Sequence, residues 1–479
     1  MDKDFKLAST LLTLLDSEQR WFTLAEVEKS LHISDKTIRK LVEEINGQLP
    51  TAMTIEVSRG KGIFLQRDGR SSTTVSEVVS SMYRQTIFYR LMNVLFTNGD
   101  QWSMEELAEA MFMSTSSLKK LIMQLNNHDL KPYKIRITYS TPAIKGNELN
   151  IRYFYWKLYG DAYEFTGWPF TNSDYDVIHQ LITKIEHEQN IVYFINAKRK
   201  LSFLVAIVLE RVKTGNYVKV TESNYHWEQA FFYLPIKALA KTLEDRYSIE
   251  LPKSEMFFLQ SLFSISQYHY YEESDMTPRK EIELYKNKEV DQMGQQLFTL
   301  LAKAYPHLEM NERFILEVYE FLAKLLIDNA IPEWMAISKS NLTNYVQIEC
   351  QQIYQTMQNC MQKWQKAYPS VLYNDFHLTK LTLLVRSGLR YKSKRAFLVI
   401  GEEFSIRHYI ANLIKNEIGD QLIIITSIMK GLTDEMVQLH DIDFVISNFP
   451  VVLSTVPVVI ISTIPSKRDL DNIRKELLQ

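Results

Sequence analysis

Apolar and polar positions near the start of the chain follow a pattern that repeats at an offset of 80 residues. Residues 22–46 match residues 102–126 without a gap. Each copy has apolar residues at helical spacing, a short break, and a second run at helical spacing, which predicts two amphipathic helices joined by a tight turn. The apolar stripe of the second helix consists of Ile38, Leu41, Val42 and Ile45 in the first copy and of Leu118, Leu121, Ile122 and Leu125 in the second.

The second helix of each copy begins after a serine and carries polar residues on its outer face. Ser34 and Ser114 are suited to cap the helix, because a serine hydroxyl accepts a hydrogen bond from an amide of the first turn. A braced helix with hydroxyl and basic side chains on its first turns is typical of a helix-turn-helix that reads the major groove. The residues predicted to enter or flank the groove are Lys36, Thr37, Arg39 and Lys40 in the first copy and Ser116, Ser117, Lys119 and Lys120 in the second.

Each helical pair is followed by a candidate wing. Residues 54–65 alternate as a strand, turn at Gly60 and Gly62, and return as a strand, with Arg59 and Lys61 at the tip. The second wing is predicted to begin at Ile135 and Ile137, to break at Pro142 and Gly146, and to resume at Leu149 and Ile151. The basic residues expected to contact the DNA backbone or the minor groove are Arg59, Lys61 and Lys145.

The middle of the chain reads almost continuously as helix. The predicted helices span 175–189, 198–213, 226–246, 253–271, 288–304, 311–328, 341–366 and 374–391. Residues 201–209 are so uniformly apolar that their helix is expected to be buried nearly all round. The aromatic-rich region 153–175 lacks interleaved lysine and arginine, which favours a hydrophobic joint between domains over a platform for stacking nucleic-acid bases.

Short apolar strands alternate with helices after residue 395. This alternation predicts a small α/β domain with a parallel sheet. Gly401 ends the first strand where a phosphate loop would lie, but Glu402 and Glu403 would repel a phosphate, and the loop has neither a second glycine nor a cysteine nucleophile. An inert regulatory or dimerising domain is therefore expected. The predicted domains are 1–70 and 71–168 (winged helix-turn-helix units), 169–282 and 283–394 (all-α helical bundles), and 395–479 (the α/β module).

Composition limits the function classes. The chain of 479 residues has a formal net charge of −2, but residues 1–160 carry 21 basic and 18 acidic side chains, so the amino end is the better partner for a polyanion. The two cysteines, Cys350 and Cys360, exclude a disulfide framework. A charged start and the lack of a long apolar run predict a cytoplasmic protein with no membrane partner. No metal site and no cofactor is predicted.

The order of these parts resembles the Mga/AtxA-type virulence regulators of Gram-positive bacteria along the whole chain. The run from Lys200 to Gly215 is similar to a core helix of a phosphotransferase-system regulation domain (PRD), and the C-terminal module is similar to an enzyme IIB (EIIB) domain. The resemblance implies that the phosphocarrier protein phosphorylates histidines of the bundles, which would add charge to a dimer interface. Its phosphoacceptor candidate is His377, while the first bundle has Lys198-Arg199-Lys200 where the motif tends to offer histidine. The other bundle histidines are His179, His187, His226, His269 and His307.

The sequence thus predicts a DNA-binding transcription regulator, an activator that works as a homodimer or higher oligomer and is not an enzyme. Three alternatives stay open. A PRD-type RNA-binding antiterminator needs a small all-β domain at its amino end, whereas residues 1–50 read as helix. The others are an enzyme component of the phosphotransferase system and a scaffold that binds no nucleic acid.

Overall fold

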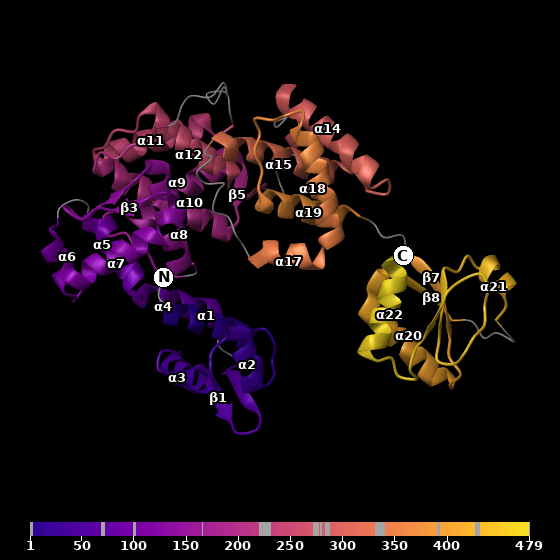
Figure 1. Ribbon diagram of the computed structural model, residues 1–479. Coiled ribbons are helices and arrows are strands. Elements are labelled where there is room, and N and C mark those ends of the chain that lie inside the picture. The colour runs from indigo at the N-terminus through magenta and orange to yellow at the C-terminus, as the bar shows by residue number, and fades with distance from the viewer. Residues whose placement is uncertain are drawn as a thin grey trace. The chain divides into compact units, whose positions relative to one another are not determined.

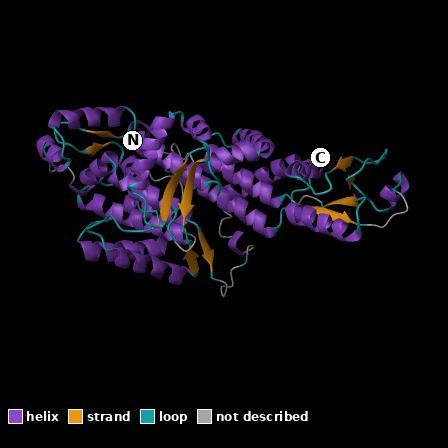
Figure 2. Ribbon diagram, turned by 90° about the horizontal axis from the view of Figure 1, so that it is seen from below, coloured by secondary structure: helices purple, strands orange, loops and turns teal. Residues whose placement is uncertain are grey.

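The computed structural model describes residues 3–68, 72–98, 102–164, 166–219, 231–271, 277, 280–282, 288–330, 341–389, 393–426 and 432–478. The chain divides into two compact units, Met1–Ala304 with Asn311–Leu384, and Tyr305–Met310 with Val385–Gln479. Helices dominate, while strands form short pairs and one four-stranded sheet (Figure 1, Figure 2). The prediction of a mainly helical, multi-domain protein is confirmed.

The first winged unit contains the helical pair and the wing that the sequence pattern predicts, with one further helix before them and one after them. It contains α1 (Lys3–Asp16), α2 (Leu24–Leu31), α3 (Asp35–Asn46), β1 (Met53–Ser58), β2 (Gly62–Arg67) and α4 (Val75–Gln85). Its core joins the apolar stripes of the helices to the inner face of the wing: Leu11, Val27, Ile38, Ile55 and Ile63 are each at most 2% exposed. Helix α3 thus presents only its polar face to solvent.

The second winged unit repeats this order, with one correction. Its elements are α5 (Ile87–Asn98), α6 (Met104–Ala110), α7 (Thr115–Asn127), the 3-10 turn η2 (Lys131–Tyr133), β3 (Arg136–Ile137), β4 (Ile144–Lys145) and α8 (Glu148–Ala162). The prediction that the wing resumes at Leu149 and Ile151 was wrong, because both residues lie in α8. Asn147 caps this helix by accepting a hydrogen bond from the Leu149 amide at 2.9 Å, so the returning strand ends at Lys145.

The first helical group contains a strand pair that the sequence pattern does not predict. The group contains α9 (Tyr175–Gln189), β5 (Ile191–Tyr193), α10 (Ile195–Lys213), α11 (Tyr233–Tyr247), α12 (Lys253–Ile265) and β6 (Tyr268–Tyr270). The predicted helix 253–271 ends early, since Ser266 adopts an extended conformation and β6 pairs with β5 in antiparallel register. Residues 201–209 are buried, as predicted. Residues 226–230, including His226, lie outside the described residues.

The second helical group contains α14 (Lys288–Ala304), α15 (Glu312–Ala330), α17 (Asn341–Glu349), α18 (Gln351–Gln365) and α19 (Asp375–Gly388). The prediction of one helix over 341–366 was wrong, because Cys350 leaves helical geometry with φ −120° and ψ 28°. In this group Trp364 of α18 is fully buried and donates a hydrogen bond to the carbonyl of Met293 in α14 at 3.0 Å.

Helix α8 is the joint between the second winged unit and the first helical group. Its aromatic residues Tyr155 and Tyr159 are buried in a single core that extends from Tyr83 to Phe263, as the aromatic pattern predicts. The same helix carries a buried charge. Arg152 is 0% exposed and forms a bidentate ion pair with Glu255 of α12, at 2.6 and 3.0 Å, and a hydrogen bond with Glu148 at 2.9 Å.

The C-terminal module is a parallel α/β sheet, as predicted. It contains β7 (Lys394–Val399), α20 (Phe404–Ile418), the 3-10 turn η4 (Gly419–Gln421), β8 (Leu422–Ile425), α21 (Asp434–Leu439), β9 (Phe444–Ser447), β10 (Val458–Ile460) and α22 (Lys467–Leu478). The strand order is β10-β9-β7-β8, with every pair parallel. Helices α20 and α22 pack on one face of the sheet and α21 on the other (Figure 1).

Candidate nucleic-acid interface

The two helix-turn-helix units have the same local construction. Ser34 accepts a hydrogen bond from the Thr37 amide at 3.4 Å, and Ser114 accepts one from the Ser117 amide at 3.2 Å. The preceding helices α2 and α6 each begin with a capping box, formed by Thr23 with Glu26 and by Ser103 with Glu106. The pKa of each glutamate is lowered, first because its carboxylate accepts a backbone N–H at the cap. The two units therefore use the same bonds: a serine cap at the amino end of each recognition helix and a capping box at the amino end of the helix before it.

All the side chains predicted to face DNA are exposed. Behind them Ile38 and Leu118 are 0% exposed, so the polar face of each recognition helix is fixed by burial of its opposite side. The hydroxyls of Thr37, Ser116 and Ser117 contact the capping serine at 2.8 to 3.0 Å. The exposed residues are Lys36, Thr37, Arg39, Lys40, Arg59, Lys61, Ser116, Ser117, Lys119, Lys120 and Lys145.

The charges of the two recognition helices differ. On α3, Arg39 pairs with Asp35 at 2.7 Å and Lys40 pairs with Glu44 at 3.2 Å. Helix α7 contains no acidic residue, and within the described residues no ion pair involves Lys119 or Lys120. These two lysines present positive charge without an acidic neighbour on their own helix, which suits contact with phosphates.

The first wing depends on a close backbone approach. Phe22 exchanges backbone hydrogen bonds with Ile63 at 2.8 and 2.9 Å, which attaches the segment before α2 to the edge of β2. Gly62 makes this possible, since a Cβ there would lie 2.0 Å from the Phe22 carbonyl oxygen, and its φ is +106°. Arg59 and Lys61 then occupy the tip, with the Lys61 ammonium 5.6 Å from the centre of the Trp21 ring.

The second wing pairs two cations across its strands. Arg136 lies directly opposite Lys145, and both are exposed. Like charges in this position are unfavourable unless an anion lies between or beside them. Arg136 was missed as a candidate for DNA contact, although its basic charge counted in favour of the region. Its position opposite Lys145 is known only from the structure, in which the returning strand ends at Lys145.

An asparagine locks each wing to its recognition helix. The Asn46 side chain donates to the Ile55 carbonyl at 2.9 Å and accepts from the Ile55 amide at 2.8 Å. Asn126 makes the same two bonds to Ile137, at 2.9 and 2.8 Å. These residues were not predicted as functional, but both occupy the same place in the 80-residue repeat. The clamp fixes where the wing lies relative to the helix that would enter the groove.

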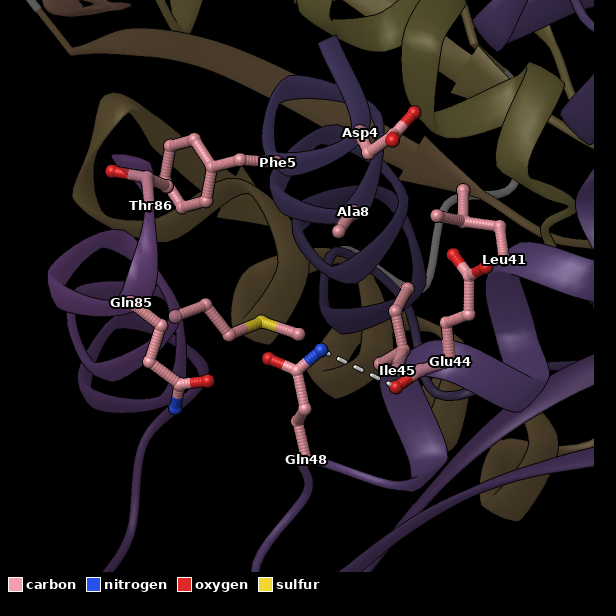
Figure 3. A pocket seen from close by; sticks show the side chains of 10 residues that line it. Asp4, Phe5, Ala8, Leu41, Glu44, Ile45, Gln48, Gln85 and Thr86 are labelled. Carbon is pink, nitrogen blue, oxygen red and sulfur yellow. Dashed lines mark hydrogen bonds between the residues drawn. The ribbon is translucent and has the colours of Figure 1, made fainter. Parts of the chain in front are cut away.

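A pocket of about 240 Å³ lies behind the first recognition helix (Figure 3). Its lining includes the buried apolar residues Leu41, Ile45 and Met82. Glu44 and Gln48 also line it and are joined by a 3.5 Å hydrogen bond from the Gln48 side chain to the Glu44 carbonyl. Its lining comes from α1, α3 and α4, so the pocket lies on the side of α3 that faces the other two helices. It is therefore separate from the polar face of the recognition helix.

The phosphoacceptor candidate His377 lies at the start of α19. Its Nε2 lies 2.9 Å from Asp328 of α15, and its Nδ1 accepts a hydrogen bond from the Asn374 amide at 3.2 Å. The His377 side chain is only 4% exposed. Both ring nitrogens are thus engaged, and a phosphoryl group would reach either one only after the amino end of α19 moved.

The described residues contain no cluster of three or more histidine, cysteine or acidic side chains arranged to hold a metal ion. Across those same residues, none of the helices combines the length and the apolar character needed to cross a membrane.

Two family models match the amino end of the chain. The M protein trans-acting positive regulator (MGA) HTH domain matches residues 2–61, and the Mga helix-turn-helix domain matches residues 71–159. The similarity to curated proteins extends over nearly the full length. The capsule synthesis positive regulators AcpB and AcpA of Bacillus anthracis are each 26% identical, over 99% and 98% of this chain and 98% of each relative. The chain belongs to the Mga/AtxA-type regulators.

A third member of the Mga/AtxA-type regulators supports the same assignment. The anthrax toxin expression trans-acting positive regulator of Bacillus anthracis is 24% identical over 99% of this chain and 98% of its own length. The matched proteins are regulators and not enzymes, and this chain shares their class. The two matched HTH segments contain the two duplicated helical pairs, with α2 and α3 in the first and α6 and α7 in the second.

Proposed function

We propose that this Mga/AtxA-type regulator binds double-stranded DNA through α3, α7 and the two wings, and activates transcription in the cytoplasm. The observation that carries the proposal is the duplicated recognition helix, whose basic side chains are exposed in both copies. The relatives named as positive regulators support activation as the direction of control. The helical amino end speaks against the RNA-binding antiterminator, which requires an all-β domain there.

The test is a titration of the full-length protein against pooled duplex fragments from its own genome and against hairpin RNA, followed by fluorescence anisotropy. We expect duplex DNA to bind more tightly, with an affinity that falls steeply with salt because counterions are released from the phosphates. Binding to hairpin RNA alone would contradict the proposal in favour of an antiterminator. Binding to neither at low ionic strength would favour the scaffold.

We further propose that the two helical groups are PRD-like bundles and the C-terminal module is EIIB-like, and that the phosphocarrier protein phosphorylates His377. The ion-pair geometry supports a switch, because phosphorylation would break the contact with Asp328 and place two negative charges beside that carboxylate. Incubating the protein with phosphoenolpyruvate, enzyme I and the phosphocarrier protein should label it on histidine. His377→Ala should remove the label and His269→Ala, at an exposed site, should keep it; the reverse would contradict the assignment.

We propose that the protein works as a homodimer or higher oligomer. Half-sites on DNA are commonly read by symmetric dimers, and each chain here supplies two readers. Sedimentation velocity over a hundredfold range of concentration should show a dimer or larger species. A monomer throughout, in the presence of the bound duplex as well, would contradict this part of the proposal.

A further inference from the structure

The outer face of α6 differs in character from the DNA-facing surface beside it. Glu105 and Glu109 lie four residues apart on the exposed face of α6, and Phe112 is exposed in the left-handed turn that follows this helix; we call these three residues the α6 stripe. Phe112 is 88% exposed, whereas Leu107 on the opposite side of the helix is fully buried. The stripe ends two residues before the Ser114 cap of α7. It therefore flanks the proposed groove-reading helix without being part of it.

The backbone at Phe112 is left-handed, with a φ of +56°. His32, the equivalent residue of the first copy, has the same φ. Bulky side chains are disfavoured in this conformation, which suits glycine or asparagine. Because both copies have this conformation, the turn belongs to the shared fold, and the bulky aromatic ring at this position is what distinguishes the second copy. The matching positions of the first copy are Ala25, Lys29 and His32, so the first copy has neither the acids nor the large apolar ring.

The charge of the α6 stripe indicates which partner can cover it. Within the described residues, neither Glu105 nor Glu109 has an ion pair or a side-chain hydrogen bond. Arg90 lies over the ring, with its guanidinium carbon 6.0 Å from the centre of Phe112. Two unneutralised carboxylates would repel DNA phosphates. An exposed aromatic anchor with a charged rim is instead the arrangement of a protein contact site.

We propose that the α6 stripe docks a basic protein surface with an apolar socket for Phe112, carried by the transcription machinery bound beside this regulator on the same DNA. The inference rests on the proposed function, which places α7 in the groove and so leaves the stripe facing a neighbour on the duplex. The acids steer a basic partner, and the ring supplies the buried contact. This makes the second unit both a DNA reader and an activating surface.

The test uses the full-length protein with purified bacterial RNA polymerase holoenzyme and a duplex selected in the binding experiment. The variants are Phe112→Asn, which suits the left-handed turn, and Glu105→Gln/Glu109→Gln; His32→Asn is the matched control in the first copy. We expect DNA affinity to stay within about twofold, while affinity for the polymerase and transcript yield each fall about tenfold for both stripe variants. The control should behave as the unsubstituted protein.

Normal polymerase binding and transcript yield in both stripe variants would overturn the proposal. So would a tenfold loss of DNA affinity in Phe112→Asn or in the glutamine pair, because the stripe would then belong to the DNA interface. Circular dichroism shows whether each variant is folded, and the glutamine pair decides the matter if Phe112→Asn is not. An unsubstituted protein that ignores duplex DNA, yet binds the polymerase through Phe112, would contradict the proposed function and leave the docking surface standing.

Discussion

The two winged units share their bonds and differ in their charges. Both have a capping box, a left-handed turn, a capping serine and an asparagine clamp, at equivalent positions. Yet α3 carries Asp35, Glu43 and Glu44, whereas α7 carries no acid. Duplication has therefore kept the contacts that set the geometry of the fold and has changed the surface. We expect α7 to supply more of the salt-dependent affinity for DNA, and α3 to contribute less.

The largest expected effect is on the first wing, which has a close approach at Gly62. Gly62→Ala places a methyl group against the Phe22 carbonyl and forces alanine into a positive φ, so we expect a loss of about 3 kcal/mol in the free energy of unfolding of this unit. Urea denaturation followed by hydrogen exchange at Ile63 measures it. Gly60→Ala is the control, because its Cβ would meet no atom within 4 Å; equal losses in the two variants would show that backbone strain alone matters.

The next effect compares the cations of the two recognition helices. Lys119→Ala/Lys120→Ala should weaken DNA binding about sixtyfold at 0.1 M salt and flatten the slope of log affinity against log salt by about two, since each phosphate contact contributes about 0.9. Arg39→Ala/Lys40→Ala should have a smaller effect, because Asp35 and Glu44 already offset those charges. Anisotropy titrations over a salt series measure both slopes. An unchanged slope for the lysine pair would remove α7 from the interface.

The asparagine clamps should respond alike in the two units. Asn46→Ala and Asn126→Ala each leave a backbone N–H and a carbonyl of the wing without their side-chain partner, and we expect each to cost about 1–3 kcal/mol of stability. Asn→Asp keeps the acceptor and loses the donor, so it should retain part of the stability. Thermal unfolding of the four variants and of the unsubstituted protein measures this. A loss of stability in only one of the two units would show that the two clamps are not equivalent.

The smallest expected effect is a change in how the stability of the protein depends on pH. The pKa of Glu26 and of Glu106 is lower in the folded protein than in the unfolded chain, so their contribution to stability is present above the ordinary glutamate pKa of about 4.3 and is lost as the pH falls through the folded value. Glu26→Gln and Glu106→Gln should each make stability less dependent on pH in this window. NMR titration of the two carboxyl groups checks the direction; an upward shift in either would contradict the capping box.

The sequence predicted the elements whose pattern is local. The 80-residue repeat predicted both helical pairs, and the alternation after residue 395 predicted every strand of the C-terminal sheet. The error in the second wing arose because Leu149 and Ile151 have strand-like spacing, while the capping by Asn147 that starts α8 there depends on a single side chain. All the candidate DNA contacts proved exposed, since exposure follows from the apolar stripe opposite them.

What was missed depends on distant parts of the chain. Strands β5 and β6 have three residues each and are more than 70 residues apart, so neither shows a strand signal without its partner. The asparagine clamp joins a helix end to a strand backbone and has no residue pattern of its own. Arg136 gained its meaning only from the register that places it opposite Lys145.

Helix α8 limits where the chain can be divided into fragments that fold independently. The matched HTH segment ends at residue 159, inside this helix, but the carboxylate that neutralises Arg152 belongs to Glu255, nearly a hundred residues farther along. A fragment that stops at the end of the matched segment would lack Glu255 and the helical group that covers α8, so Arg152 would keep only Glu148 as a partner and the apolar core around α8 would be exposed to water. The second winged unit follows the first directly in the chain. For its folding, however, it depends on the helical group that comes after it.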